Sequence, residues 1–193
     1  MIRLVFLVEG ETDFQILRFL VQRIVQEDVE CIRRQRRFGG LGDVFASVVG
    51  CVWQAYQWRA SGAVIHADAD RSTPHASHVG KPPGDCRYCA IAELVPVVPE
   101  PRPKVCIGVP VEAIEAWLLE WGDLIGIKRP RDVERLPRRR GKELLWGSAT
   151  PRREDVTVVC EKLFPLVAPE HIERLAESQE SFRTFRASLQ SLS

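Results

Sequence analysis

Residues 4–13 read LVFLVEGETD, an apolar run that ends in carboxylates. A near-continuous apolar run is typical of a parallel strand that is covered on both faces. A second run, VIHADADR at residues 64–71, ends in an Asp-x-Asp pair. Buried strands that stop at carboxylates are one way in which an α/β protein builds a site for a divalent cation. The two stretches therefore direct the search for function to Glu9, Asp68 and Asp70.

Apolar strands and amphipathic helices alternate along the first 121 residues. This β-α-β-α-β-α-β-α order favours a parallel four-stranded sheet flanked by crossover helices, the Rossmann-like α/β class. The predicted strands are residues 2–8, 29–35, 62–67 and 104–109, and the predicted helices are residues 14–25, 43–59, 86–95 and 110–121.

The pattern changes after Gly122. Residues 129–140 are basic and interrupted by prolines, and residues 154–166 and 170–192 show the spacing of amphipathic helices with no strand between them. We therefore expect an α/β domain over residues 1–122 and a helical C-terminal extension over residues 123–193 that packs on it.

The composition is that of an ordinary globular chain of 193 residues. Its net charge of +1 produces no global positive field, so any contact with nucleic acid must come from local patches. No apolar run approaches the roughly 20 residues that span a membrane, and the N-terminal run is too short for a signal peptide. We expect a cytoplasmic protein whose six cysteines are thiols or metal ligands.

The three carboxylates are expected to meet at one edge of the sheet. In an open α/β sheet, residues just past the carboxyl ends of the strands line the ligand crevice. The spacing of two residues puts Asp68 and Asp70 on the same side if the backbone stays extended. Together with Glu9 they would repel one another unless a cation lay between them. Mg²⁺, or Mn²⁺, suits such hard oxygen ligands.

The VEGETD stretch and the strand-end DAD together resemble the TOPRIM domain of topoisomerases, primases, recombination-repair proteins and OLD-family nucleases. That resemblance implies that Glu9, Asp68 and Asp70 bind Mg²⁺ for phosphoryl transfer on nucleic acid. IGVPVEAIEAWLL at residues 107–119 and SFRTF at residues 181–185 are similar to a group of short stand-alone bacterial TOPRIM-like proteins of unknown function. These are related to the OLD nucleases and are suspected of roles in phage defence.

Two further glutamates lie in the predicted helix over residues 110–121. Glu112 and Glu115 are three residues apart, which places them on one face of a helix. Carboxylates in a first helical turn are also favoured by the helix dipole, and this explanation needs no ligand. Glu115 lies in the EAW triplet of the resembled group and is the better candidate for holding a second metal ion.

Several basic residues are candidates for contact with a phosphate. The resemblance implies a basic catalytic residue near the scissile phosphate, and Lys142 fits by position and charge. Arg71, directly after the DAD triplet, is expected to contact nucleic acid, as are Arg138, Arg139 and Arg140. The alternative for all of them is a solvated surface.

A second metal site is predicted in the segment that follows the DAD triplet. His75, His78, Cys86 and Cys89 form a His-x2-His-x7-Cys-x2-Cys pattern. All four side chains are good Zn²⁺ ligands, and two nitrogens with two sulfurs make a common structural site. The alternative is that Cys89 is buried against the helix beside it.

The leading functional hypothesis is a Mg²⁺-dependent phosphoryl-transfer enzyme on nucleic acid, most simply a nuclease that acts on DNA rather than RNA, in DNA repair or phage defence. One alternative is a nucleotidyltransferase of primase type. Another is a non-catalytic, nucleic-acid-binding or regulatory partner of a separately encoded ATPase. A P-loop ATPase is excluded because no Gly-x4-Gly-Lys-Ser/Thr motif is present. The sequence leaves the cleavage position and the oligomeric state open.

Overall fold

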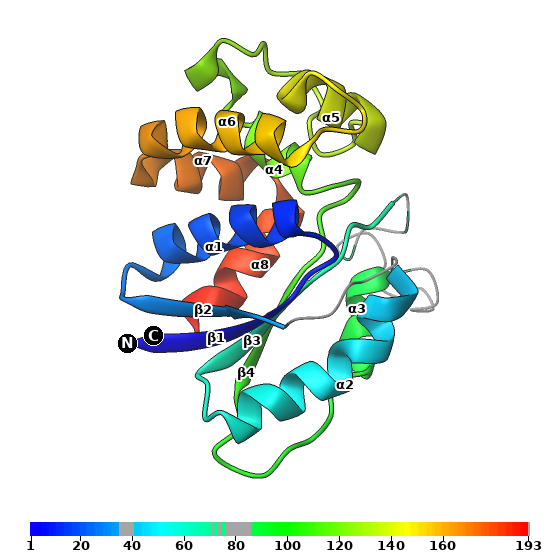
Figure 1. Cartoon of the computed structure of the whole chain (residues 1–193), viewed down its shortest axis with the longest axis vertical. Helices are drawn as coiled ribbons and strands as arrows, with labels where there is room; N and C mark the ends of the chain where they lie inside the picture. The colour runs from blue at the N-terminus through cyan, green and yellow to red at the C-terminus, as the bar shows by residue number, and fades with distance from the viewer. Residues whose placement is uncertain (35–40, 71, 73–74, 76–85, 193) are drawn as a thin grey trace.

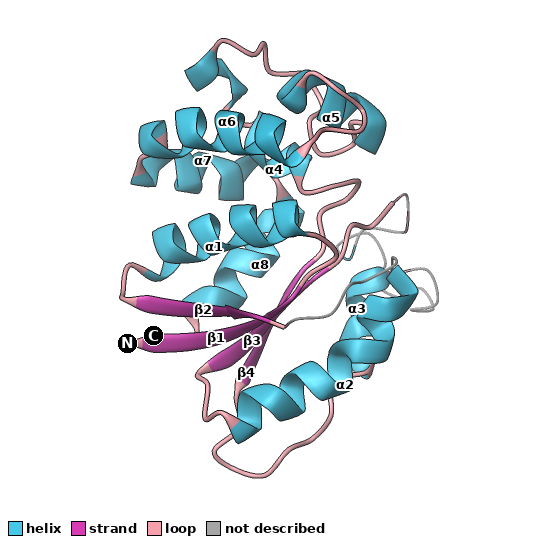
Figure 2. Cartoon of the chain, viewed as in Figure 1, coloured by secondary structure: helices cyan, strands magenta, loops and turns pink. Residues whose placement is uncertain are grey.

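Four parallel strands form one sheet in the order β2-β1-β3-β4, with helices on both faces (Figure 1; Figure 2). The computed structural model describes residues 1–34, 41–70, 72, 75 and 86–192. The prediction of an α/β chain with a parallel four-stranded sheet is confirmed. The strands are β1 (Ile2–Leu7), β2 (Val29–Arg33), β3 (Gly62–His66) and β4 (Lys104–Gly108).

The burial of each strand follows its place in the sheet. β1 and β3 are the inner strands, and their residues are almost all buried. β2 is an edge strand, and four of its five residues are only partly buried, which explains how it accommodates charged side chains. Leu4 of β1 pairs with Gly62 of β3, and Leu7 pairs with Ile65. This register brings the carboxyl ends of β1 and β3 side by side.

Alternate residues of β1 face two separate hydrophobic clusters. Leu4 and Phe6 pack with helices α1 (Glu11–Val25) and α8 (Glu180–Gln190). Val5 and Leu7 pack on the opposite face with α2 (Leu41–Gln57) and α3 (Arg87–Glu93). Because side chains alternate along a strand, a run that is apolar at every position must be covered on both faces.

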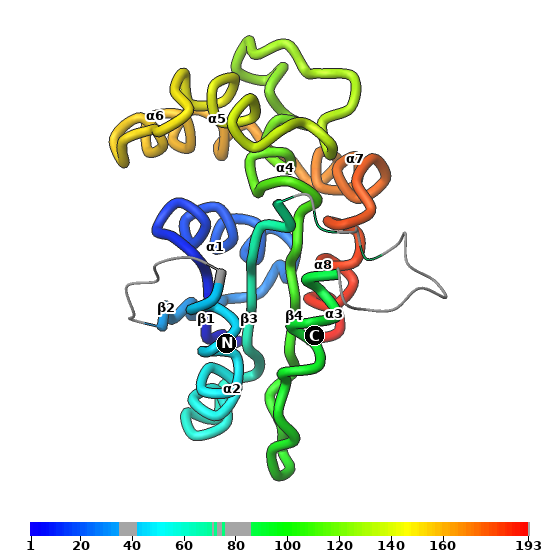
Figure 3. Tube along the Cα trace, turned by 90° about the vertical axis from the view of Figure 1, so that its right-hand side faces the viewer, coloured from blue at the N-terminus to red at the C-terminus, as the bar shows by residue number. Residues whose placement is uncertain are grey.

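The remaining helices form a layer beyond the carboxyl edge of the sheet (Figure 1). The chain then returns to the sheet as α8, which lies beside β4 (Figure 3). None of the helices in the described part of the chain is long and apolar enough to cross a membrane. The layer consists of α4 (Glu115–Leu119), η3 (Gly122–Ile125), α5 (Arg138–Trp146), α6 (Arg153–Leu163), η4 (Phe164–Leu166) and α7 (Pro169–Ser178).

Two aromatic residues of α8 join the C-terminal helices to the sheet. Phe182 and Phe185 are fully buried and pack on Trp117 of α4, with ring centroids 5.2 and 5.5 Å away. The same hydrophobic cluster contains Leu4 and Phe6 of β1. The C-terminal helices therefore share one core with a face of the sheet.

The predicted helix over residues 110–121 is wrong in its first part, because α4 begins only at Glu115. The preceding residues instead bond to the segment that follows β3. The amide of Ala69 donates to the Pro110 carbonyl at 3.0 Å, and the amide of Asp70 donates to the Glu112 carbonyl at 3.4 Å. Glu112 therefore does not lie in a first helical turn, and its pairing with Glu115 on one helix face is also wrong.

The predicted helix over residues 170–192 is also wrong in part, because it is divided into α7 and α8. The break is at Gln179, whose backbone is extended (φ −127°, ψ 115°). The buried Gln179 side chain donates from Nε2 to the Ala116 carbonyl at 2.8 Å. This contact with α4 stabilises the break between the two helices. The hydrophobic periodicity of the sequence does not predict it.

Candidate functional site

Five carboxylates gather where β1 and β3 end, and we call them the acidic cluster: Glu9, Asp13, Asp68, Asp70 and Glu115. A hydrogen bond of 3.1 Å from the Asp68 amide to Glu9 Oε1 joins the two strand ends. The parallel register of β1 and β3 makes this contact possible, because both strands end at the same level in the sheet. The structure thus brings together carboxylates that are 59 residues apart in the chain.

Asp68 is as enclosed as Glu115, and each has only 3% of its surface exposed. Its Oδ1 accepts a hydrogen bond of 3.1 Å from the Ile114 amide, and its Oδ2 lies 3.4 Å from Arg138 Nη2. Burial, followed by the charges of Asp13 and Glu115, raises the pKa of Asp68 well above its usual value. A cation beside it would therefore offset an unfavourable concentration of negative charge.

Asp70 does not lie beside Asp68 in the way that the spacing of two suggests. Its backbone takes a left-handed conformation, with φ of 43°, so the chain turns and the condition of an extended backbone fails. The Asp70 carboxylate is 36% exposed, and its two oxygens lie 3.1 Å from Arg87 and 3.2 Å from Arg138. In this arrangement Asp70 is neutralised by arginines.

Glu115 is the member of the acidic cluster that comes from the first turn of α4. It is buried, and its Oε1 accepts a hydrogen bond of 3.0 Å from Trp146 Nε1 and lies 3.9 Å from Lys142 Nζ. Burial raises its pKa, and the charge of Lys142 opposes that rise. Glu115 Oε2 is buried and has no hydrogen-bond partner among the described residues. It is therefore an oxygen that a bound cation would satisfy.

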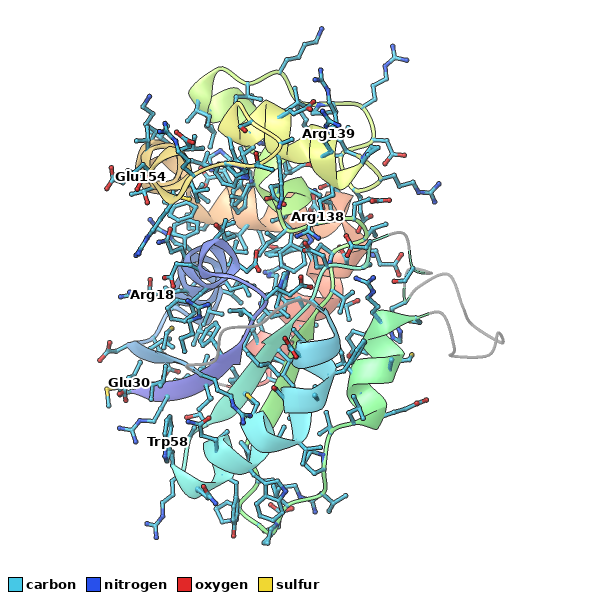
Figure 4. The ribbon with its side chains drawn as sticks, turned by 45° about the vertical axis from the view of Figure 1, so that its right-hand side comes forward. Arg18, Glu30, Trp58, Arg138, Arg139 and Glu154 are labelled. Atoms are coloured by element: carbon cyan, nitrogen blue, oxygen red, sulfur yellow. The ribbon has the colours of Figure 1, made fainter. Side chains whose placement is uncertain are left out.

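The three consecutive arginines at the start of α5 have different surroundings. Arg138 reaches Asp68 and Asp70, whereas Arg139 and Arg140 pair with Glu143 on the same helix. The Arg139 side chain is 82% exposed. In Figure 4 it lies on the outer side of the helical layer, and Arg138 lies closer to the sheet. Of the three, Arg138 is therefore the one that belongs to the site.

Asp13 is a member of the acidic cluster that sequence reasoning missed. Its Oδ2 accepts a hydrogen bond of 2.8 Å from the Gly10 amide at the start of α1. Its charge contributes to the raised pKa values of Glu9, Asp68 and Glu115. The sequence signal that could have found it is an acidic residue three positions after Gly10, the N-cap of α1, where its side chain bonds back to the N-cap amide.

His66, the last residue of β3, was also missed. It is fully buried, its Nε2 lies 3.9 Å from Asp68 Oδ1, and neither ring nitrogen has a hydrogen-bond partner among the described residues. Burial lowers its pKa to about 4, so the ring is neutral at physiological pH. The alternation of strand residues places positions 66 and 68 on one side, which is the signal that could have found it.

The acidic cluster fits a divalent cation by charge more than by preformed geometry. Glu9 has a raised pKa, mainly through burial, and Glu115 has an unpartnered oxygen. No three of these carboxylates nevertheless place oxygens within 4.8 Å of one another, and Arg138 occupies oxygens of both Asp68 and Asp70. Binding of a cation would require this guanidinium to give up its contacts.

One group of three metal-ligating side chains does converge in the described part of the chain. The ligand atoms of His75, Cys86 and Cys89 all lie within 4.8 Å of one another. His78, predicted as the fourth ligand, lies outside the described residues, as does Arg71.

Comparisons of the chain with models of protein families, with curated proteins and with solved structures found no match. The fold and the site together define an α/β protein with a parallel sheet and an acidic cluster at its carboxyl edge, in which Asp68 and Glu115 are buried.

Proposed function

We propose that this chain is a divalent-cation-dependent phosphoryl-transfer enzyme of TOPRIM type that acts on nucleic acid, most simply as a nuclease. The observation that carries the proposal is the hydrogen bond between the Asp68 amide and Glu9 at the paired ends of β1 and β3. The buried Glu115 extends the same group of carboxylates from a third element. Carboxylates at the carboxyl edge of a parallel sheet are suited to hold a cation where a phosphate can approach it.

The carboxylates of the acidic cluster have two roles in the proposed reaction. Glu9, Asp13, Asp68 and Glu115 would hold Mg²⁺ or Mn²⁺, which when bound stabilises negative charge on a phosphodiester and favours ionisation of water. Glu9 is the candidate general base, since burial raises its pKa and so makes the carboxylate a stronger base.

The basic residues of α5 would act on the phosphate. Lys142 lies 3.9 Å from Glu115, so its ammonium is already held beside the acidic cluster. Arg138 would leave Asp68 when this carboxylate takes up a cation, and its guanidinium would then be able to bind a phosphate oxygen. DNA is the proposed substrate, and the net charge of +1 favours delivery of that substrate by a partner such as a separately encoded ATPase.

A second candidate function is a non-catalytic, nucleic-acid-binding or regulatory role. It is favoured by the pairing of Asp70 with Arg87 and Arg138, which neutralises this part of the acidic cluster by protein groups alone. A chain of this kind would keep those ion pairs and would bind no divalent cation.

The test compares the native chain with Glu9→Gln and Asp68→Asn, and with Glu154→Gln as a control. Glu154 lies on α6, away from the acidic cluster (Figure 4). Each protein is incubated with supercoiled DNA, single-stranded DNA and RNA in Mg²⁺ or Mn²⁺, and Mn²⁺ binding is measured by electron paramagnetic resonance. We expect cleavage by the native and control proteins and a loss of about a hundredfold or more in the other two.

Other results of the cleavage and Mn²⁺-binding measurements would contradict the nuclease proposal. Cleavage that survives both substitutions would show that the acidic cluster is not the active site. Mn²⁺ binding without cleavage of any polymer would overturn the nuclease assignment and leave a cation-binding module. The absence of both Mn²⁺ binding and cleavage would favour the non-catalytic role.

A further inference from the structure

The segment between β3 and α3 carries a second cluster with a different chemistry, formed by His75, Cys86 and Cys89. His75 Nδ1 lies 3.4 Å from Cys89 Sγ and 3.8 Å from Cys86 Sγ. Cys86 immediately precedes α3, and Cys89 lies in the first turn of this helix. We propose that these three side chains bind a thiolate-preferring divalent metal ion, zinc by the chemistry of the ligands, which fixes the start of α3 beside the acidic cluster.

The distances agree with a shared ion. Zinc binds sulfur at about 2.3 Å and imidazole nitrogen at about 2.0 to 2.1 Å, so tetrahedral angles place N and S about 3.6 Å apart. The two observed N···S distances, 3.4 and 3.8 Å, lie on either side of that value. If both contacts were hydrogen bonds, the two sulfurs would have to share the single proton or lone pair of Nδ1. Convergence on a common point explains both.

The ligand set also selects among metals. Two cysteine sulfurs and one imidazole are poor ligands for Mg²⁺ and good ligands for Zn²⁺. The His75 ring packs on Tyr88, with centroids 4.1 Å apart, which fixes the plane of the imidazole. Orientation of a ligating histidine by its neighbours is a regular feature of metal sites.

A metal ion at this site would also affect the acidic cluster, through Arg87. Arg87 lies between the two cysteines in the chain, and its guanidinium donates to the Asp68 carbonyl and pairs with Asp70. An ion that holds Cys86 and Cys89 therefore also holds the backbone from which Arg87 reaches the acidic cluster. Arg87 is a positioning residue in this account, and the metal site stands whether or not the chain is a nuclease.

The test measures metal content and ligand chemistry in the full chain. Zinc is determined by elemental analysis in the purified native protein and in Cys86→Ser, Cys89→Ser and Cys31→Ser. Cys31 lies on β2 and serves as the matched thiol control. We expect zinc in the native protein and in Cys31→Ser, and its loss from the other two. His75→Ala should weaken binding roughly tenfold or more.

The absorption spectrum of bound Co²⁺ tests the site in the native chain itself. Co²⁺ added to the reduced, zinc-stripped native chain should produce a sulfur-to-metal charge-transfer band and intense d–d bands of tetrahedral coordination. Cys89→His, which replaces one thiolate with an imidazole, should keep the metal and lose about half of the charge-transfer intensity. A native chain without this band, or full zinc content in Cys86→Ser with native far-ultraviolet circular dichroism, would overturn the proposal.

Discussion

The indole Nε1 of Trp146 donates a hydrogen bond of 3.0 Å to the buried carboxylate of Glu115. Glu115 begins α4 and Trp146 ends α5, so the contact connects two helices of the C-terminal layer. Lys142 lies one turn before Trp146 and faces the same carboxylate. The helical layer therefore contributes to the acidic cluster as well as covering the sheet edge.

Replacing Trp146 by Phe should destabilise the fold by about 1 to 3 kcal/mol. The change removes the hydrogen bond to Glu115 and leaves a buried oxygen without a donor. Urea unfolding followed by circular dichroism measures the free energy of unfolding, and Trp53→Phe is the control because Trp53 is 37% exposed on α2. Equal losses in the two variants would show that the hydrogen bond to Glu115 adds nothing measurable to the stability.

Stabilisation by Mg²⁺ should increase as the pH rises from about 5 to about 8. The folded-state pKa values of Glu9, Asp68 and Glu115 are raised, mainly by burial. Bound protons therefore stabilise the folded state, and this contribution is complete at pH values below the pKa values of the unfolded chain. It is lost as the pH rises through the higher pKa values of the folded chain. A cation replaces those protons, so it stabilises the fold most when they are gone.

Thermal melts with and without Mg²⁺ at several pH values measure this effect. At saturation we expect an increase in Tm of about 5 °C or more at the higher pH. Asp68→Asn should remove most of the increase. A shift in Tm that does not depend on pH would mean that Mg²⁺ binds elsewhere on the chain.

Replacing Arg138 by Gln should strengthen Mn²⁺ binding by roughly tenfold while reducing any cleavage. The guanidinium competes with a cation for Asp68 and Asp70, and its removal also leaves a phosphate without its proposed partner. The Arg138 side chain is 40% exposed, so screening keeps the gain modest. Arg139→Gln, which removes an exposed arginine from the same helix, should change neither value, and weaker Mn²⁺ binding in Arg138→Gln would contradict the competition.

Two Gly→Ala substitutions should have opposite effects on stability. A Cβ at Gly62 would lie 2.7 Å from the Lys104 carbonyl oxygen, so β3 and β4 would have to move apart, at a cost of about 1 to 3 kcal/mol. A Cβ at Gly42, in α2, meets nothing within 4 Å, and the change should stabilise the helix by up to about 1 kcal/mol. Urea unfolding of both variants checks the pair, and a tolerated Gly62→Ala would contradict the close approach of the strands.

Much of the fold could be predicted because its signals are local. The apolar run of β1, the helical spacing of α1 and the order of the elements identify a parallel sheet. The position of Glu9 and Asp68 at strand ends follows from the same reasoning. The early part of the predicted helix over residues 110–121 was wrong because its backbone groups bond to the distant segment after β3.

The sequence identified most members of the candidate site, but not Asp13 or His66, and it did not identify their arrangement. Glu9 and Asp68 were identified from their places after strands, Glu115 from its place in a predicted helix and in the EAW triplet, and His75, Cys86 and Cys89 from their spacing. Which of them meet depends on contacts between elements. Asp70 is turned toward Arg87 and Arg138 by a left-handed backbone, and no spacing rule describes that turn.

The sequence by itself determined the class of fold and the residues with which a metal-binding chemistry could be built, because hydrophobic periodicity and ligand type are properties of short segments. Only the tertiary structure decided that Trp146 and Lys142 reach Glu115, that Arg138 bridges Asp68 and Asp70, and that three metal-ligating side chains converge. These contacts join segments far apart in the chain. Their geometry is set by packing and by hydrogen bonds that form only when the elements are assembled.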